Sequence, residues 1–222
     1  MREYESYIFD LDGTLLDTLD DLAAATNHAL RVHGMPEHSR DDVRRFVGNG
    51  VRKLVERAVP EGTDEQQTEA VLTTFRSYYL AHSLDRTRPY EGIPELLTGL
   101  KQRGCRLAVV SNKFCAATEE LCRHFFPDTI GVAIGENEAA GIRKKPAPDT
   151  VLAALRQLGT GAEGAVYVGD SDVDIATARH AGLPCISVLW GFRDRDFLLA
   201  HGATMLAAHP LDLLRSLFMS PL

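Results

Sequence analysis

The sequence predicts an α/β protein, in which a parallel β-sheet is covered by helices on both faces and a helical domain is inserted after the first strand. Strand-like and helix-like segments alternate after residue 90, which is typical of such sheets. Residues 17–86 contain helical patterns and no convincing strand. Two acidic clusters each follow a short apolar run. Ligands of parallel sheets bind beyond the carboxyl ends of the strands, so these clusters also indicate a site.

The first strand is the apolar run 7–9, and the inserted helices follow it. Helical periodicity covers 19–32, 40–46 and 51–59, and Gly48-Asn49-Gly50 separates the last two. The run Thr63-Asp64-Glu65-Gln66 fits a capping box that opens a long helix towards residue 82. The expected domains are therefore a core of residues 1–16 and 87–222 and an insert of residues 17–86.

The second half of the chain alternates strands with helices, and glycines mark several helix ends. Apolar runs rich in β-branched residues predict strands at 106–110, 130–134, 165–168 and 185–189. Helical patterns cover 94–103, 114–125, 148–158, 172–181, 195–201 and 210–218. Because strands and helices take turns, we expect a parallel sheet that is buried on both faces.

Composition and charge exclude several classes of function. The 222 residues are 45% hydrophobic and 25% charged, and the net charge of −7 argues against a general nucleic-acid or membrane-surface binder. The four cysteines lack CxxC spacing, which favours reduced thiols over a zinc site or disulfides. The chain shows neither a signal peptide nor an apolar run of about 18 residues. We expect a cytoplasmic protein, and its state as a monomer or a homodimer stays open.

The polar residues that follow the strands supply a consistent chemistry. Asp10 and Asp12 follow the first strand closely enough to repel each other unless a cation compensates. Ser111-Asn112-Lys113 follows strand 106–110, and Asp170-Ser171-Asp172-Val173-Asp174 follows strand 165–168. A basic run at 143–148 precedes a helix. Carboxylates suit Mg²⁺, while a hydroxyl and an ammonium suit a phosphoryl group. One carboxylate can attack phosphorus while its neighbour moves a proton.

These residues resemble the four motifs of the haloacid dehalogenase-like hydrolases, in the same order. Asp10-Leu11-Asp12-Gly13-Thr14 resembles the first motif and Ser111 the second, while Lys145 in a KPxP pattern resembles the third. Asp170 with Asp174 resembles the fourth. The resemblance covers essentially the whole chain and implies a Rossmann-like core. The helical insert resembles the cap domain of members whose cap follows the first motif.

The resemblance implies a role at each matching position. Asp10 would be the nucleophile and a Mg²⁺ ligand, and Asp12 the general acid/base with its backbone carbonyl on the metal. Asp170 would ligate Mg²⁺, and Asp174 would support the metal directly or through water. Ser111 and Lys145 would hold phosphoryl oxygens. Thr14 and Asn112 are also expected to contact substrate. The dehalogenases of the family lack an acid where Asp12 stands, so its presence favours phosphoryl transfer.

The substrate is expected to be small and phosphorylated. The stretch Phe46-Val47-Gly48-Asn49-Gly50-Val51 resembles the cap loop of phosphoglycolate phosphatases, and Leu189-Trp190-Gly191-Phe192 also resembles that subgroup. We therefore expect Gly48, Asn49 and Gly50 to bind substrate and favour 2-phosphoglycolate. Glycine there permits a tight turn and close backbone approach.

Several alternatives remain open at the level of sequence. Pyrophosphate, a nucleoside monophosphate or a sugar phosphate could be the substrate, and a phosphomutase would share all four motifs. A phosphonate hydrolase would need a cap lysine, for which Lys53 is the one candidate, although a surface role suits it better. A non-catalytic scaffold would have no need of these groups. The cap loop could be a simple turn between helices. Asp172 could be a helix cap or a first-turn charge instead of a ligand, and Lys144 could take the role expected for Lys145.

Overall fold

The structure is a computed structural model, and it describes residues 4–137 and 141–215. Contacts within the chain divide it into two compact units. The first comprises Met1–Leu16 and Pro89–Leu222, and the second is Asp17–Arg88. The second unit extends slightly beyond the expected insert of residues 17–86. No helix among the described residues is long and apolar enough to cross a membrane.

The first unit is built on a sheet of six parallel strands, which confirms the expected α/β class. The strand order is β5-β4-β1-β6-β7-β8, so the first strand lies at the centre. The strands are β1 (Ser6–Phe9), β4 (Arg106–Phe114), β5 (Val132–Glu136), β6 (Ala165–Gly169), β7 (Cys185–Val188) and β8 (Met205–Ala207). Neighbouring strands are in register at β1, where Phe9 pairs with Val109 on one side and Val168 on the other.

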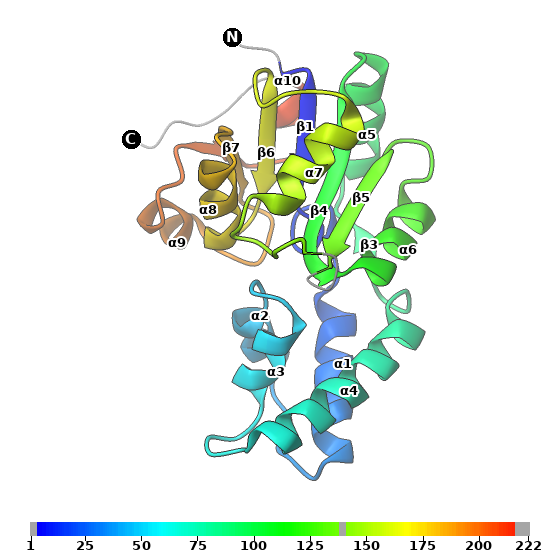
Figure 1. Cartoon of the computed structure of the whole chain (residues 1–222), viewed down its shortest axis with the longest axis vertical. Coiled ribbons are helices and arrows are strands. Elements are labelled where there is room, and N and C mark those ends of the chain that lie inside the picture. The colour runs from blue at the N-terminus through cyan, green and yellow to red at the C-terminus, as the bar shows by residue number, and fades with distance from the viewer. Residues whose placement is uncertain (1–3, 138–140, 216–222) are drawn as a thin grey trace. The chain divides into compact units, whose positions relative to one another are not determined.

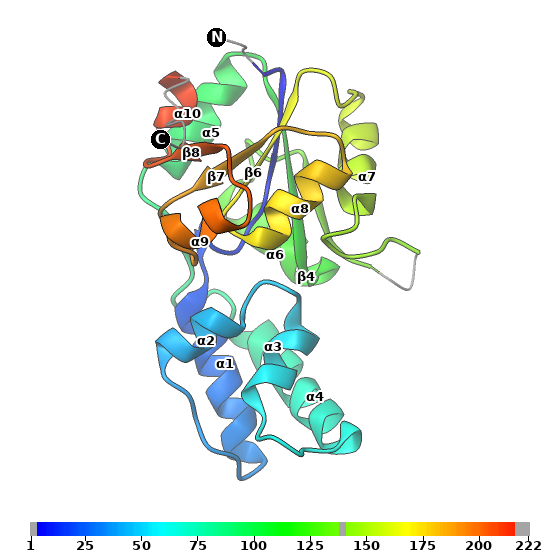
Figure 2. The same ribbon diagram turned by 90° about the vertical axis from the view of Figure 1, so that its left-hand side faces the viewer.

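Helices cover both faces of this sheet (Figures 1 and 2). One apolar cluster joins the sheet to α5 (Ile93–Gln102), α6 (Cys115–Phe125) and α10 (Asp212–Arg215). A second cluster on the opposite face joins it to α7 (Asp149–Leu158) and α8 (Asp172–His180). A smaller cluster lies under α9 (Arg195–Ala200). Burial of both faces explains why the strands read as continuous apolar runs.

Some element boundaries differ from the expected ones. Strand β4 continues to Phe114 instead of ending at residue 110, with a register shift between Val110 and Phe114. The polar residues of the second motif therefore lie on the irregular end of a strand. Strand β5 begins at Val132, two residues late, and β8 was not expected, since Met205–Ala207 is too short to show a pattern. Helix α10 begins at Asp212, and the rest of its expected range lies outside the described residues.

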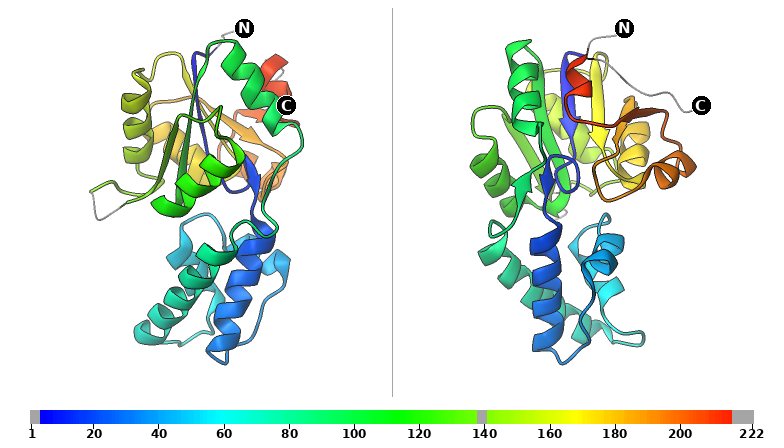
Figure 3. Two further views of the ribbon diagram at one scale, coloured as in Figure 1. Left: turned by 90° about the vertical axis from the view of Figure 1, so that its right-hand side faces the viewer. Right: turned by 180° about the vertical axis from the view of Figure 1, so that it is seen from behind.

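The second unit is helical, as expected. It contains α1 (Leu19–Val32), α2 (Arg40–Phe46), α3 (Val51–Ala58) and α4 (Glu65–His82). Helices α1 and α4 lie side by side, in blue and teal in Figure 3. The expected capping box from Thr63 to Gln66 is wrong: Asp64 is the N-cap and accepts from the Gln67 backbone, while the Thr63 hydroxyl donates to the Pro60 carbonyl. The short strands β2 (Leu16–Asp17) and β3 (Arg88–Pro89) pair where the chain leaves and re-enters the first unit.

Candidate active site

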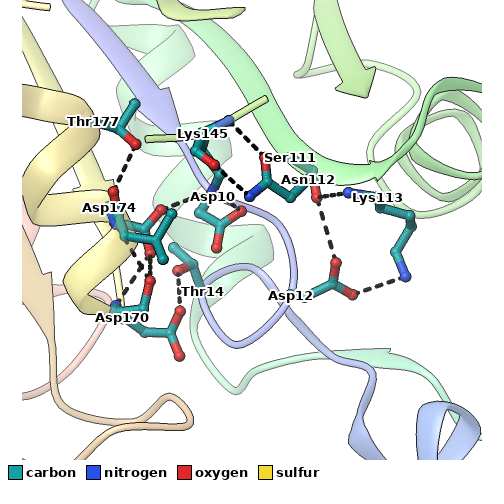
Figure 4. A network of polar contacts seen from close by, with 12 residues as sticks. Asp10, Asp12, Thr14, Ser111, Asn112, Lys113, Lys145, Asp170, Asp174 and Thr177 are labelled. Carbon is teal, nitrogen blue, oxygen red and sulfur yellow. Dashed lines mark hydrogen bonds and ion pairs between the residues drawn. The ribbon is translucent and has the colours of Figure 1, made fainter. Parts of the chain in front are cut away.

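The expected core-motif residues gather at the carboxyl ends of the three central strands (Figure 4). Asp10 follows β1 and Asp170 follows β6, while Ser111 and Asn112 belong to the end of β4. The register that aligns Phe9 with Val109 and Val168 brings these ends together. The backbone N–H of Asp10 also donates to the Val168 carbonyl at 2.9 Å.

Three buried carboxylates form the acidic centre of the site. One oxygen from each of Asp10, Asp170 and Asp174 lies within 4.8 Å of the others. Burial and the charge of Asp174 raise the pKa of Asp10 well above its usual value, although Lys145 partly opposes this. Burial and the same charge raise the pKa of Asp170 to about 7. Like charges held this closely out of water disfavour ionisation unless a cation joins them.

Lys145 is the cation nearest to this centre among the described residues. Its side chain is buried, and the ammonium lies 2.7 Å from Asp10 Oδ1 and 2.8 Å from Asp174 Oδ1. Burial lowers the pKa of Lys145, but the charges of Asp10 and Asp174 outweigh it and raise the pKa above the ordinary value. The neighbouring Lys144 is only half-buried. Of the two lysines, Lys145 is therefore the one whose ammonium lies against the acidic centre.

Asn112 holds the Lys145 loop in place. Its amide nitrogen donates to the Lys145 carbonyl at 3.0 Å, and its amide oxygen accepts from the Lys145 backbone N–H at 2.7 Å. This reciprocal pair joins two segments that are 33 positions apart in the chain. In the structure Asn112 thus contacts backbone, although the sequence suggested a substrate contact.

Asp174 is bound through both of its oxygens. Oδ2 accepts from the Ser171 hydroxyl and backbone in a capping box at the start of α8. Oδ1 accepts from Lys145 and from the Tyr167 hydroxyl at 2.9 Å. Asp172 lies in the first turn of α8, and Ser171 is the cap. Sequence reasoning missed Tyr167, because an aromatic residue in a buried strand gives no signal beyond packing.

Asp12 has a different environment from Asp10. Its Oδ1 lies 3.1 Å from the ammonium of Lys113, and its Oδ2 accepts a long hydrogen bond of 3.4 Å from Ser111. Lys113 is buried, and its backbone N–H also donates to the Ser111 hydroxyl. Lys113 was not expected to take part in the site. A lysine directly after the Ser111-Asn112 pair was the available signal.

Asp170 is positioned by two segments that are distant in sequence. The backbone N–H of Phe192 donates to its Oδ2 at 2.7 Å, and the buried Thr14 hydroxyl lies 3.4 Å from its Oδ1. Trp190 donates from its indole to the Thr14 carbonyl at 2.9 Å. Gly13 has φ +88°, and a side chain there would collide with the Asp170 carboxylate. Phe192 therefore holds Asp170 directly, while Trp190 holds Thr14, which faces Asp170.

The expected cap loop connects α2 to α3 within the second unit. Gly48 and Gly50 both have positive φ, 132° and 86°, a region that favours glycine. The Arg57 guanidinium donates to the Phe46 carbonyl at 2.7 Å and to the Asn49 amide oxygen at 2.6 Å. Lys53 forms an exposed ion pair with Glu56. The loop is thus a turn held by Arg57. Nothing in the sequence predicts these contacts of Arg57.

The acidic centre has the chemistry of a divalent-cation site. All three side chains offer hard oxygen ligands, which suit Mg²⁺. A cation bound there would favour the ionised forms of Asp10 and Asp170 and so relieve the repulsion that raises their pKa values. The arrangement combines such a site with a carboxylate, a buried ammonium and a second carboxylate nearby.

Comparison with known proteins identifies related chains. Residues 7–188 match the family model described as haloacid dehalogenase-like hydrolase. A phosphoglycolate phosphatase of Aquifex aeolicus is 38% identical over 190 residues, which cover 83% of this chain and 84% of the relative. An N-acetylmuramic acid 6-phosphate phosphatase of Pseudomonas aeruginosa is 32% identical over 212 residues, covering 95% and 93%.

A solved structure gives the same result for the fold. It comes from Lactobacillus delbrueckii subsp. bulgaricus and is provisionally assigned as a phosphoglycolate phosphatase. Its TM-score to this chain is 0.92 at 36% identity, and the alignment covers 97% of this chain and 99% of the other. The likeness therefore extends over both units.

Proposed function

Because the chain belongs to the haloacid dehalogenase-like hydrolases, we propose that it is a Mg²⁺-dependent phosphomonoesterase that hydrolyses 2-phosphoglycolate to glycolate and phosphate. The single observation that carries the reaction class is the contact of 2.7 Å between Asp10 and the Lys145 ammonium beside two further buried carboxylates. This arrangement joins a nucleophile, a cation for the phosphoryl group and a metal site.

The proposed metal ligands are the carboxylates of Asp10 and Asp170 and the backbone carbonyl of Asp12, with Asp174 supporting the site. When bound, Mg²⁺ would neutralise charge on the phosphoryl group and keep the carboxylates ionised. The mutual proximity of Asp10, Asp170 and Asp174 supports this assignment. Thr14 and the Phe192 backbone would hold Asp170 in place.

In the proposed reaction, an oxygen of Asp10 attacks phosphorus and the bond from phosphorus to the leaving oxygen breaks. Lys145 and the Ser111 hydroxyl hold the phosphoryl oxygens. The protonated side chain of Asp12 gives its proton to the leaving oxygen, which yields the alcohol and an aspartyl-phosphate on Asp10. Asp12 then takes a proton from water, which attacks phosphorus and releases phosphate with Asp10 restored.

Asp12 is well placed to differ in role from Asp10. Its contacts are Lys113 and Ser111 rather than the three-carboxylate centre. A carboxylate outside that centre can leave these partners and move a proton without giving up a metal ligand. This division of roles favours phosphoryl transfer over dehalogenation, because dehalogenation needs no acid at the position of Asp12 to protonate the leaving group.

The choice of 2-phosphoglycolate rests on the cap loop and on the names of relatives. Gly48, Asn49 and Gly50 are proposed to recognise the small anionic leaving group, because positive-φ glycines let backbone N–H groups approach a ligand closely. Several relatives at 34–38% identity carry the name phosphoglycolate phosphatase.

A sugar phosphate is the second candidate substrate. The relative that acts on N-acetylmuramic acid 6-phosphate, by its name, aligns with 95% of this chain, a larger share than the Aquifex aeolicus relative covers. The same core chemistry would serve either substrate, since the leaving group is selected elsewhere.

We propose a cytoplasmic reaction, which the four free cysteines support because such thiols persist in reducing compartments.

A substrate panel tests the proposal directly. Phosphate release should be measured with 2-phosphoglycolate, N-acetylmuramic acid 6-phosphate, pyrophosphate and a nucleoside monophosphate, with Mg²⁺ and with a chelator. The expected result is the highest kcat/KM for 2-phosphoglycolate and loss of activity with chelator. A clear preference for another substrate would overturn the substrate assignment. Phosphate release at the same rate with chelator as with Mg²⁺ would overturn the metal assignment.

A further inference from the structure

We propose that Tyr167 is a positioning residue for Lys145, with its buried hydroxyl holding the ammonium in place while the phosphoryl group enters and leaves. The inference rests on the proposed function, in which Lys145 binds phosphoryl oxygens. Tyr167 lies on β6, fully buried, and belongs to none of the four motifs. Its ring packs with the cluster under α7 and α8, and its hydroxyl reaches the site.

The contacts of the Lys145 ammonium carry the inference. An ammonium has three N–H donors and no acceptor. Three oxygens lie within reach: Asp10 Oδ1 at 2.7 Å, Asp174 Oδ1 at 2.8 Å and Tyr167 Oη at 3.1 Å. Each hydrogen therefore has an acceptor within reach, and the three contacts together set the orientation of the ammonium.

The three acceptors differ in what the reaction does to them. Asp10 is the proposed nucleophile, so its oxygen changes partners when it bonds to phosphorus. Asp174 and Tyr167 take no part in bond making and can keep their contacts throughout. Tyr167 also donates its own hydrogen to Asp174 Oδ1 at 2.9 Å. The Tyr167 hydroxyl therefore contacts both the ammonium and Asp174, the other acceptor that keeps its contact during the reaction.

Loss of this hydroxyl should leave one hydrogen of the ammonium without an acceptor in a buried place. A lysine side chain has many rotamers, and buried donors seek replacement partners. Asp10 and Asp174 would remain as acceptors, so the ammonium would be held at two points instead of three and would lose its fixed alignment with the phosphoryl oxygens. The bound substrate can restore the missing contact in the ground state, but fixed alignment is needed in the transition state.

The test compares Tyr167→Phe with Tyr7→Phe. Tyr7 is a buried tyrosine on the neighbouring strand β1, and it packs in the cluster on the opposite face of the sheet. Both variants lose one hydroxyl and keep the ring. Turnover of p-nitrophenyl phosphate with Mg²⁺ should be measured for each protein. The thermal midpoint of each protein should be measured as well, as a check that it is folded. Tyr167→Met provides a second variant without the hydroxyl if the phenylalanine form fails to fold.

We expect Tyr167→Phe to lower kcat about tenfold with KM within about twofold of the parent, because one charge-assisted contact of the transition state is misaligned. Tyr7→Phe should keep its kcat. The inference is overturned if a folded Tyr167 variant keeps kcat within twofold, or if Tyr7→Phe loses as much. A parent protein without Mg²⁺-dependent turnover would instead refute the proposed function, which separates the two failures.

Discussion

Lys144 and Lys145 are adjacent residues of the same type, and the structure gives them very different surroundings. Lys145 lies among Asp10, Asp174 and Tyr167, while Lys144 is half-buried outside that group. Removing a buried cation between two carboxylates leaves their charges without compensation. The consequences for catalysis should therefore differ sharply between the two positions.

Lys145→Met should lower kcat by roughly 10²–10³, the usual cost of losing a transition-state charge contact. Lys144→Met is the matched control and should stay within about threefold of the parent. Phosphate release with saturating Mg²⁺ checks both. Equal losses in the two variants would show that the basic run acts through its general charge and not through Lys145.

At the same scale, the sequence predicted which residue types meet but not all of their partners. Asp10 and Asp170 stood out because charged groups after apolar strands need a use, and Lys145 stood out through its KPxP pattern. Tyr167 and Lys113 did not, since a tyrosine in an apolar run and a lysine beside a polar pair are ordinary in sequence. Asn112 was expected on the substrate, whereas its amide joins the Lys145 backbone. Such pairings depend on tertiary contacts.

At the scale of elements, the turn between α2 and α3 is braced by Arg57. Its guanidinium donates to the carbonyl of Phe46, the last residue of α2, where the helix leaves carbonyls without internal partners. It also donates to the Asn49 amide oxygen, so the acceptor end of that side chain faces Arg57 and its N–H₂ donor group points the other way. The brace thus fixes how Asn49 is oriented.

Arg57→Met should raise KM for 2-phosphoglycolate about tenfold while changing turnover of p-nitrophenyl phosphate by less than about threefold, because only the small anionic leaving group needs the oriented loop. Arg52→Met on the same helix α3 is the control, since Arg52 pairs with Glu65 and Glu69 instead of the loop. Equal effects of Arg57→Met on both substrates would contradict a role in leaving-group selection.

Most elements were predictable because their patterns are strong. The helices at 19–32 and 40–46 begin and end at the expected residues, since amphipathic periodicity marks them clearly. Strand β8 and the extension of β4 to Phe114 were missed, because a short strand and an irregular polar strand end show no alternation. The N-cap of α4 was misplaced by one residue, because Thr63 and Asp64 are both good caps and only the local geometry separates them.

At the scale of the whole molecule, the acidic centre links metal binding to stability. The pKa of Asp170 is raised to about 7, mainly by burial and then by Asp174, so without metal the folded state holds a proton more tightly than the unfolded chain. This contribution to stability is present below the unfolded pKa of about 4 and is lost as the pH rises through about 7. Mg²⁺ binds the ionised form and should compensate for that loss.

We expect Mg²⁺ at about 100 times its Kd to raise the thermal midpoint by roughly 5–10 °C at pH 8, since binding at that ratio is worth about 2.7 kcal/mol. The same Mg²⁺ concentration should give a clearly smaller gain at pH 5.5, because protons compete there for the same carboxylates. Scanning calorimetry with Mg²⁺ and with a chelator measures it. Asp170→Asn is the control and should lose most of the gain. An equal gain at both pH values, or none, would contradict a carboxylate metal site.

The proposed reaction requires Asp10 as the nucleophile, and the turnover of Asp10→Asn measures that requirement. Asp172→Asn is the matched control, because Asp172 is a first-turn charge of α8 outside the acidic centre. With Mg²⁺ and 2-phosphoglycolate, a folded Asp10→Asn protein should release phosphate at least about 10³-fold more slowly than the parent. Asp172→Asn should remain close to it. Turnover of Asp10→Asn within about tenfold of the parent would contradict the role of Asp10 as nucleophile.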